Sequence, residues 1–139
     1  ALKAQAPKKL HWKPTHVHVI GAGTMGADIA GVCVAAGMEV TLQDISPEQI
    51  EKGIAAQGKL FARKFKTKAT RDAAKARLMA DPDGKGVGRA DVVIEAIVEK
   101  LDIKQKLFAD LETKAKPGAV LATNTSSLKL SDIAQPMQD

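Results

Sequence analysis

Three closely spaced glycines stand between an apolar segment and an alanine-rich one. Gly21, Gly23 and Gly26 fit the pattern G-x-G-x-x-G. In such a turn the first glycine permits a tight bend, the second lets a pyrophosphate approach the backbone, and the third lets helix and strand pack closely. The helix start, with Thr24 and Met25, would offer free N–H groups to the phosphates. The turn is therefore predicted to bind a dinucleotide; the alternative is a turn of this shape that has lost its nucleotide.

Asp44 is the acidic residue that such a site requires. It closes the second predicted strand, 18 residues after Gly26. At that place a carboxylate accepts hydrogen bonds from the adenosine ribose hydroxyls, and its charge repels a 2′-phosphate. The predicted cofactor is therefore NAD rather than NADP. The alternative is that Asp44 caps the next helix, a task for which Ser46 competes.

Two further polar groups follow predicted strands, on the side where ligands lie in this architecture. Glu95, Glu99 and Lys104 follow one apolar strand, and spacing alone favours a plain salt-bridged helix start for them. Residues 124–127 (NTSS) follow the next strand, where their hydroxyls could hold a substrate oxygen near the nicotinamide. The alternative there is an N-cap for the following helix, from Ser127 or Ser131.

The cysteine and the histidines are given structural interpretations. Cys33 lies among small apolar residues of the first helix and is expected to be packed. His16 and His18 begin the first strand, at the end away from the ligand crevice, and His11 lies in the N-terminal tail. No His, Cys and carboxylate cluster has the spacing of a metal site, so no metal is expected.

Strands and helices alternate along the chain. Hydrophobic patterning and turn residues predict strands at 16–20, 39–43, 77–80, 91–96 and 119–123, and helices at 24–36, from 47 to about 67, after 70, at 99–114 and at 131–135. The predicted fold is α/β, a Rossmann-like doubly wound parallel sheet with a helical hairpin inserted after the second strand.

The order 3-2-1-4-5-6 of such a sheet would lack its sixth strand here. The sheet is thus expected to be truncated before its last strand, with residues 1–14 as a linker and 15–139 as an incomplete NAD-binding domain. The strand at 119–123 would be an uncovered edge, and apolar edges invite pairing with another chain. The chain is therefore expected either to self-associate through that edge or to be only marginally stable.

The amino-acid composition excludes several classes of protein. Aromatic residues make up 3% of the 139 residues and there is one cysteine, which argues against base-stacking nucleic-acid platforms and disulfide scaffolds. Residues 51–77 hold nine Lys and Arg against two acids, so much of the net charge of +5 lies in one segment. That segment suits a small phosphorylated ligand or a solvated helix face. No membrane span and no secretory signal are expected, which predicts a cytoplasmic or matrix-like location.

Four motifs in order resemble the L-3-hydroxyacyl-CoA dehydrogenases. They are residues 21–26 (GAGTMG), Asp44, residues 95–99 (EAIVE) and residues 124–127 (NTSS), within a similarity that covers 16–139. The tail before them is similar to the linker of multifunctional fatty-acid oxidation proteins. The resemblance implies NAD-dependent oxidation of a 3-hydroxyacyl-CoA to a 3-ketoacyl-CoA in β-oxidation, in the cytoplasm of a bacterium or in a mitochondrial matrix or peroxisome.

The resemblance also implies roles for individual residues. Glu99 and Lys104 would lie beside the nicotinamide half of NAD, and Ser126 would bind the substrate oxygen at C3. Lys68, with Arg63, Lys64 and Lys66, would lie where the family's helical hairpin approaches the acyl-CoA. The catalytic histidine and its glutamate would follow Asp139, so this chain is expected to bind NAD without turnover.

Two alternative functions remain open at this point. One is a β-hydroxyacid dehydrogenase-type reductase with a similar glycine-rich turn. The other is a noncatalytic nucleotide-binding or interaction module whose basic segment contacts an acidic partner.

Overall fold

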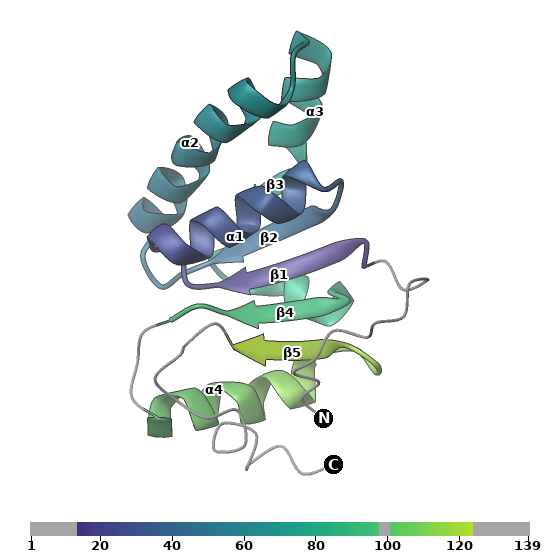
Figure 1. Cartoon of the computed structure of the whole chain (residues 1–139). Coiled ribbons are helices and arrows are strands. Elements are labelled where there is room, and N and C mark those ends of the chain that lie inside the picture. Colours follow the sequence, from purple (N-terminus) through teal and green to yellow (C-terminus); the bar gives the residue numbers. More distant parts are fainter. Residues whose placement is uncertain (1–13, 98–100, 124–139) are drawn as a thin grey trace.

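Five parallel strands form one sheet at the centre of the molecule (Figure 1). The structure is a computed structural model that describes residues 14–97 and 101–123. The strands are β1 (His16–Ile20), β2 (Glu39–Gln43), β3 (Leu78–Ala80), β4 (Val92–Glu95) and β5 (Val120–Thr123). They lie in the order β3-β2-β1-β4-β5 with every pairing parallel, which confirms the predicted doubly wound topology.

Four α-helices and one short 3₁₀ helix connect the strands. They are α1 (Thr24–Ala35), α2 (Pro47–Lys64), α3 (Lys68–Arg77), η1 (Lys85–Arg89) and α4 (Leu101–Lys114). The 3₁₀ helix was not predicted, since five residues with two glycines carry no helical periodicity. Within the described residues, no helix is both long and apolar enough to cross a membrane.

Alternation along β1 divides the core between the two faces of the sheet. Val17 and Val19 pack with residues of α1, α2 and α3 in the larger apolar cluster. Ile20 packs in a second cluster with Phe108 and Leu111 of α4. All five residues of β1 are buried, as expected for a central parallel strand covered on both sides.

The helical hairpin forms because each of its helices has its own cap. Ser46 Oγ accepts from the backbone N–H of Gln49 at the start of α2, as the sequence predicted. Thr67 Oγ1 accepts from the N–H of Thr70 at 3.1 Å and so starts α3 at Lys68. The predicted boundaries, about 67 for the end of one helix and 70 for the start of the next, were therefore late. Figure 1 shows the hairpin extending beyond the β3 edge of the sheet.

The sheet face that η1 covers carries a cluster of buried polar side chains, which is unusual for a parallel sheet. Thr41 Oγ1 lies 2.9 Å from His16 Nε2 and 2.6 Å from His18 Nδ1. His18 Nε2 lies 2.7 Å from Gln43 Oε1. Asp81 Oδ2 stands 3.6 Å from His18 Nδ1 and accepts from the N–H of Gly86. Both histidines are buried within this cluster.

Acidification should destabilise the chain through these histidines. Burial lowers the pKa of both His16 and His18, because the charged imidazolium would lose its hydration. The unfolded chain therefore binds more protons than the folded chain as pH falls through about 6.5. The stabilisation is present above that pH and is lost below it. We expect the urea midpoint to fall between pH 7.5 and 5.5.

The charges around the two rings set how steep this loss is. Arg89 lowers both pKa values further, whereas Asp81 raises that of His18, and Glu39 and Asp91 raise that of His16. Asp91 itself, whose pKa is held far below normal by Lys116, stays charged across this window. A His18→Gln variant should show a smaller fall between the two pH values; an equal fall would contradict the assignment.

The β5 strand ends the described sheet on one side. Self-association along this edge remains a prediction. We expect the mass measured by light scattering to rise with concentration, since an unpaired parallel edge exposes N–H and C=O groups. A monomer mass maintained at the highest soluble concentration would contradict it.

Candidate functional site

The glycine-rich turn joins β1 to α1 through two close contacts. Gly21 has a φ of +106°, and a Cβ on it would lie 3.0 Å from the carbonyl carbon of Ala96. A Cβ on Gly26 would lie 1.7 Å from the Gly21 carbonyl oxygen, which no side chain could tolerate. Gly23 differs, because a Cβ there would meet no atom within 4 Å. Two of the three glycines are thus needed by the fold, and the third borders open space.

The N-terminus of α1 is left without a side-chain cap. Gly23 occupies the N-cap position, no side chain accepts a hydrogen bond there, and the first turn contains no acidic residue. In contrast, Ser46 and Thr67 cap α2 and α3. The first N–H groups of a helix lack intrahelical partners and carry a partial positive charge. The α1 terminus is therefore chemically suited to an anion such as a pyrophosphate.

Asp44 braces this turn as well as standing at its edge. Its Oδ2 accepts from the N–H of Ala22 at 2.8 Å and its Oδ1 from the N–H of Ser46 at 2.9 Å. Ser46, not Asp44, caps α2. Each carboxylate oxygen keeps a second lone pair, and the side chain is half-buried. The bond to Ala22, which links residues 22 positions apart, had no signal in the sequence.

A hollow of about 380 Å³ opens beside Asp44 at the carboxyl ends of β1 and β2. Its lining is mainly aliphatic and comprises Ile20, Gly21, Gln43, Asp44, Ile45, Ile97 and Leu107. Ile45, which is fully exposed, forms one wall of the hollow and leaves an apolar surface that a flat apolar group could cover. Sequence reasoning missed Ile45 and Ile97, although each lies two residues after the end of a strand.

The turn after β4 runs alongside the glycine-rich turn. The N–H of Ala96 donates to the Ile20 carbonyl oxygen at 2.8 Å. Glu95, with no exposed surface, accepts from the N–H of Ile97. This buried carboxylate shapes the turn that leads toward Glu99. Sequence reasoning had placed Glu95 among the polar residues at the strand end without a role.

Several predicted site residues lie where no side chain is described. Glu99 and Ser126 lie outside the described residues. The backbone of Lys104 belongs to α4, but its side chain is not described. The predicted placement of Glu99 and Lys104 beside the nicotinamide, and of Ser126 at the substrate oxygen, therefore remains a prediction.

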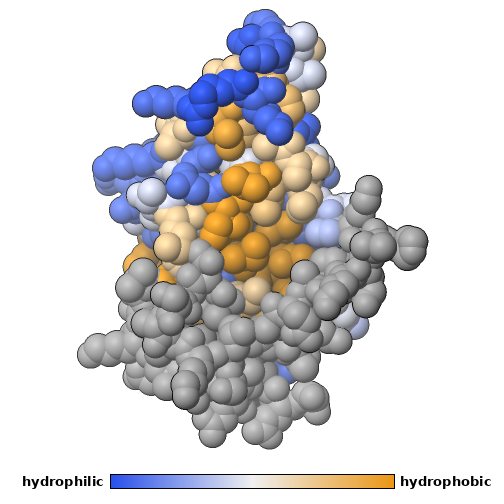
Figure 2. All heavy atoms as spheres, viewed as in Figure 1, coloured by the Kyte–Doolittle hydropathy of each residue, from blue (hydrophilic) through white to orange (hydrophobic). Residues whose placement is uncertain are grey.

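Lys68 lies at the start of α3, at the tip of the hairpin and away from the glycine-rich turn (Figure 1). Its Nζ lies 2.9 Å from Asp72 Oδ2. This hydrogen bond raises the pKa of Lys68, which is fully exposed. Figure 2 shows strongly hydrophilic residues gathered over the hairpin. Not all of its cations are available to a ligand, because Arg71 donates to the carbonyl oxygens of Phe65 and Lys66.

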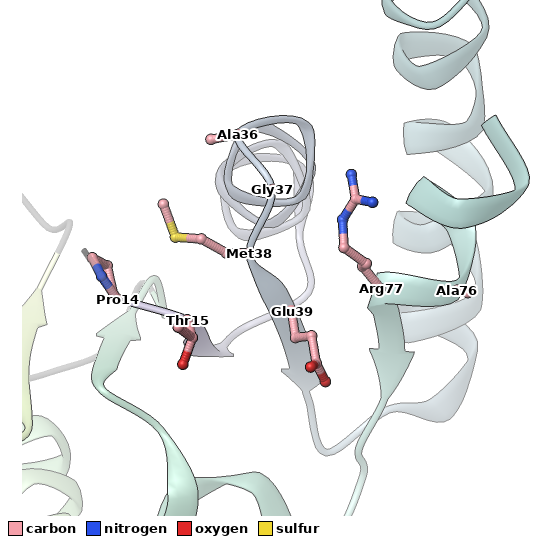
Figure 3. Close-up of a pocket in the computed structure, with 8 residues that line it drawn as sticks. All are labelled: Pro14, Thr15, Ala36, Gly37, Met38, Glu39, Ala76 and Arg77. Atoms are coloured by element: carbon pink, nitrogen blue, oxygen red, sulfur yellow. The ribbon is translucent and has the colours of Figure 1, made fainter. Parts of the chain in front are cut away.

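A larger hollow, of about 760 Å³, lies at the opposite end of the sheet (Figure 3). Its lining comprises Pro14, Thr15, Ala36, Gly37, Met38, Glu39, Ala76 and Arg77. The guanidinium of Arg77 donates to the carbonyl oxygen of Val34 and so supports the end of α1. Because ligands of doubly wound sheets bind at the carboxyl ends of strands, this hollow is not the predicted nucleotide site. The described residues contain no group of three potential metal ligands.

Comparison with known proteins agrees with this geometry. A family model described as "3-hydroxyacyl-CoA dehydrogenase, NAD binding domain" matches residues 16–139. The chain belongs to this family. NAD is accordingly the cofactor of the fold described here, as the glycine-rich turn and Asp44 predicted.

Individual relatives show how much of a longer protein the similarity covers. A probable 3-hydroxyacyl-CoA dehydrogenase of Caenorhabditis elegans is 40% identical over 137 residues, which are 91% of this chain and 44% of that protein. The fatty acid oxidation complex subunit alpha of Vibrio cholerae is 41% identical over 88% of this chain and 18% of its own length. The chain thus spans less than half of each of these relatives.

Solved structures show the same fold. The 3-hydroxybutyryl-CoA dehydrogenase of Escherichia coli K12 superposes with a TM-score of 0.79 at 38% identity, covering 88% of this chain and 27% of its own. The corresponding enzyme of Ralstonia eutropha gives a TM-score of 0.80 at 31% identity, with 89% and 45% covered. The described part of the chain thus has the fold of these dehydrogenases.

Alanine substitutions should separate the structural glycine from the ligand-facing one. Gly26→Ala would place a Cβ 1.7 Å from the Gly21 carbonyl oxygen, far closer than two atoms can pack. We therefore expect the unfolding free energy to fall by about 4 kcal/mol or more, or the variant not to fold. Gly23→Ala has open space and an ordinary φ of −67°, so its stability should stay within about 1 kcal/mol of the parent. Urea denaturation measures both.

The Gly23→Ala variant should nevertheless lose affinity for NADH. The added methyl occupies the space through which a pyrophosphate reaches the α1 N-terminus, and we expect a loss of about tenfold or more, equivalent to 1.4 kcal/mol. Fluorescence titration with NADH measures it. Retained affinity in a folded Gly23→Ala chain would contradict the predicted path of the pyrophosphate.

Proposed function

We propose that the domain binds NAD across the carboxyl ends of β1, β2 and β4, and that it serves a protein that oxidises 3-hydroxyacyl-CoA to 3-ketoacyl-CoA. The observation that carries this proposal is the uncapped α1 N-terminus at a glycine-rich turn that Asp44 braces. Membership of the family supports the cofactor, and the names of the relatives support the reaction.

The cofactor contacts follow from the described geometry. We assign the pyrophosphate to the turn of residues 21–26, where Gly21 and Gly26 hold the shape, Gly23 leaves the space, and the N–H groups of Thr24 and Met25 begin the helix. The adenosine ribose is assigned to the remaining lone pairs of Asp44. The aliphatic hollow beside it, with Ile45 and Ile97, suits the adenine base.

The remaining assignments depend on the resemblance of individual residues. Glu99 and Lys104 are proposed to hold the nicotinamide half of the cofactor, which accepts a hydride when it is bound. Ser126 is proposed to donate a hydrogen bond to the substrate oxygen at C3, orienting the carbon that loses the hydride. Lys68, on the basic hairpin, is proposed to contact the acyl-CoA, and its ion pair with Asp72 would have to open for that contact.

The location and the extent of the domain remain proposals too. We propose residues 15–139 as the cofactor domain, with the preceding tail as a linker. We also propose a cytoplasmic location if the source is a bacterium, and a mitochondrial matrix or peroxisome if it is a eukaryote; the relatives named above come from bacteria and from a nematode.

Loss of the Asp44 carboxylate should reveal whether it binds the ribose. We expect Asp44→Ala to weaken NADH binding by about 10- to 100-fold, the effect of losing hydrogen bonds to a charged group. The affinity for NADPH should fall much less, or rise, because the carboxylate that repels its 2′-phosphate is removed. Calorimetric titration with both cofactors measures the ratio, and Glu51→Ala, an exposed acid on α2, is the matched control.

Asp44 also accepts a hydrogen bond from the N–H of Ala22, so Asp44→Ala could loosen the turn as well as remove a ligand contact. The thermal midpoint of each variant is therefore measured beside its affinity. The ratio of NADH to NADPH affinity is insensitive to a general loosening of the turn, which would weaken both. An unchanged ratio in Asp44→Ala would contradict the ribose assignment.

Titration of the unaltered chain tests the function itself. We expect NADH to bind with a stoichiometry of one, and acetoacetyl-CoA, added afterwards, to bind to the NADH-loaded chain through the basic hairpin. Substitution of Lys68 by Ala should reduce only the second step. If a calorimetric titration of the folded chain with NADH shows no heat of binding, the proposal is overturned.

A further inference from the structure

Gln43 is the polar residue in the aliphatic lining of the hollow beside Asp44, together with the aspartate itself. It ends β2, and its side chain lies on the sheet face that carries the buried histidines. Its backbone carbonyl oxygen accepts from the N–H of Gly21 at 2.7 Å, which places it directly beside the glycine-rich turn. The amide therefore stands where the buried polar cluster and the proposed adenine site meet.

The hydrogen bonds of the cluster fix the tautomer of His18. Gln43 presents its carbonyl Oε1 to His18 Nε2 at 2.7 Å, and a carbonyl oxygen only accepts, so Nε2 carries the proton. In the neutral ring Nδ1 then accepts from the Thr41 hydroxyl at 2.6 Å. The Thr41 oxygen in turn accepts from His16 Nε2 at 2.9 Å. One set of proton positions thus satisfies the whole chain of bonds.

The same bond sets the orientation of the Gln43 amide. With Oε1 held by His18, the NH₂ group is the end of the amide left for other partners. Among the described residues, Gln43 Nε2 is neither hydrogen-bonded nor one of the fully buried atoms that lack a hydrogen-bond partner, so it retains contact with solvent. Gln43, which lines the hollow, thereby keeps two N–H donors that bond no described residue.

Gly84 lies close to the whole amide group. It adopts a φ of +73°, and a Cβ on it would lie 2.7 Å from Gln43 Oε1 and 3.0 Å from Gln43 Nε2. The amide is thus confined between the loop that carries Gly84 and the ring of His18, which is fully buried. Rotation of the amide would break the bond to His18 and leave a buried ring N–H unpaired, which is unfavourable.

We propose that His18 is a positioning residue for the cofactor: it holds the Gln43 amide so that the NH₂ group donates to a ring nitrogen of the adenine base. Purine ring nitrogens accept hydrogen bonds. The aliphatic side chains of the hollow can contact the base but cannot donate a hydrogen bond to it. An oriented NH₂ group adds that directional bond, which lets the site recognise adenine. This inference rests on the proposed binding of NAD. It extends that proposal, because it assigns recognition of the adenine base to Gln43 and His18, two residues outside the glycine-rich turn.

A double-mutant cycle tests the coupling between the two residues. We expect Gln43→Met to weaken NADH binding by about three- to tenfold, the effect of one neutral hydrogen bond. His18→Phe should weaken it by a similar or smaller factor, because the amide is no longer held. In the Gln43→Met background the His18→Phe change should have no further effect on affinity. Independent, multiplying losses would overturn the proposal.

His16→Phe is the matched control, because it removes a buried histidine of the same cluster that does not contact Gln43. It should reduce stability as His18→Phe does, but leave NADH affinity unchanged. Reduced nicotinamide mononucleotide, which lacks the adenosine half, should bind all variants equally. Equal NADH losses in the two histidine variants, or a parallel loss of the mononucleotide, would show a merely structural role and overturn the proposal.

Nuclear magnetic resonance of the unaltered chain keeps the proposal testable if a variant does not fold. The ring ¹⁵N shifts of His18 should show a protonated Nε2 and an unprotonated Nδ1, and the side-chain NH₂ signals of Gln43 should shift when AMP is added. The opposite tautomer, or unmoved NH₂ signals in a chain saturated with AMP, would overturn it. Failure to bind NADH or AMP at all would instead contradict the proposed function, and the two failures are thereby distinguished.

Discussion

The contact between Gly26 and the carbonyl oxygen of Gly21 is the constraint on which the site depends. A Cβ at position 26 would stand 1.7 Å from that oxygen, so the first turn of α1 packs directly on the end of β1. This closeness brings the helix N-terminus to the carboxyl edge of the sheet. It also leaves Gly23 at the N-cap with no side chain over the exposed N–H groups. Anion binding in this fold is therefore a consequence of backbone packing.

Neighbouring segments hold that turn in place from both sides. Asp44 accepts from the N–H of Ala22, and the carbonyl oxygen of Gln43 accepts from the N–H of Gly21. On the other side the backbone of Ala96 packs against Gly21, while the buried Glu95 carboxylate accepts from the N–H of Ile97. The ends of three parallel strands thus converge on one turn. A ligand bound there contacts groups whose orientation is determined before it arrives, which reduces the entropic cost of binding.

Local signals determined much of what was predicted. The alternation of strands and helices, the glycine spacing and Ser46 with Pro47 at a helix start were all read from neighbouring residues, and the parallel order followed from chain connectivity. The errors occurred where local signals were weak. The hairpin boundaries were late, because Thr67 is as good a cap as the residues after it, and η1 has no periodicity to read. Glu99, Lys104 and Ser126 were assigned by resemblance, and their side chains lie outside the described part of the chain.

The sequence by itself determined the fold class, the family and the identity of the phosphate-facing turn, because these depend on residue types at short, fixed spacing. Only the tertiary structure decided what surrounds that turn. The bond from Asp44 to Ala22, the hollow walled by Ile45 and Ile97, and the cluster joining His18, Thr41 and Gln43 all connect residues distant in sequence. The sequence analysis placed His16 and His18 at the strand end away from the ligand, yet His18 is hydrogen-bonded to Gln43 of the neighbouring strand, which lines the hollow beside Asp44. Pairing register and burial determine such contacts, and neither can be read from the spacing of single residues.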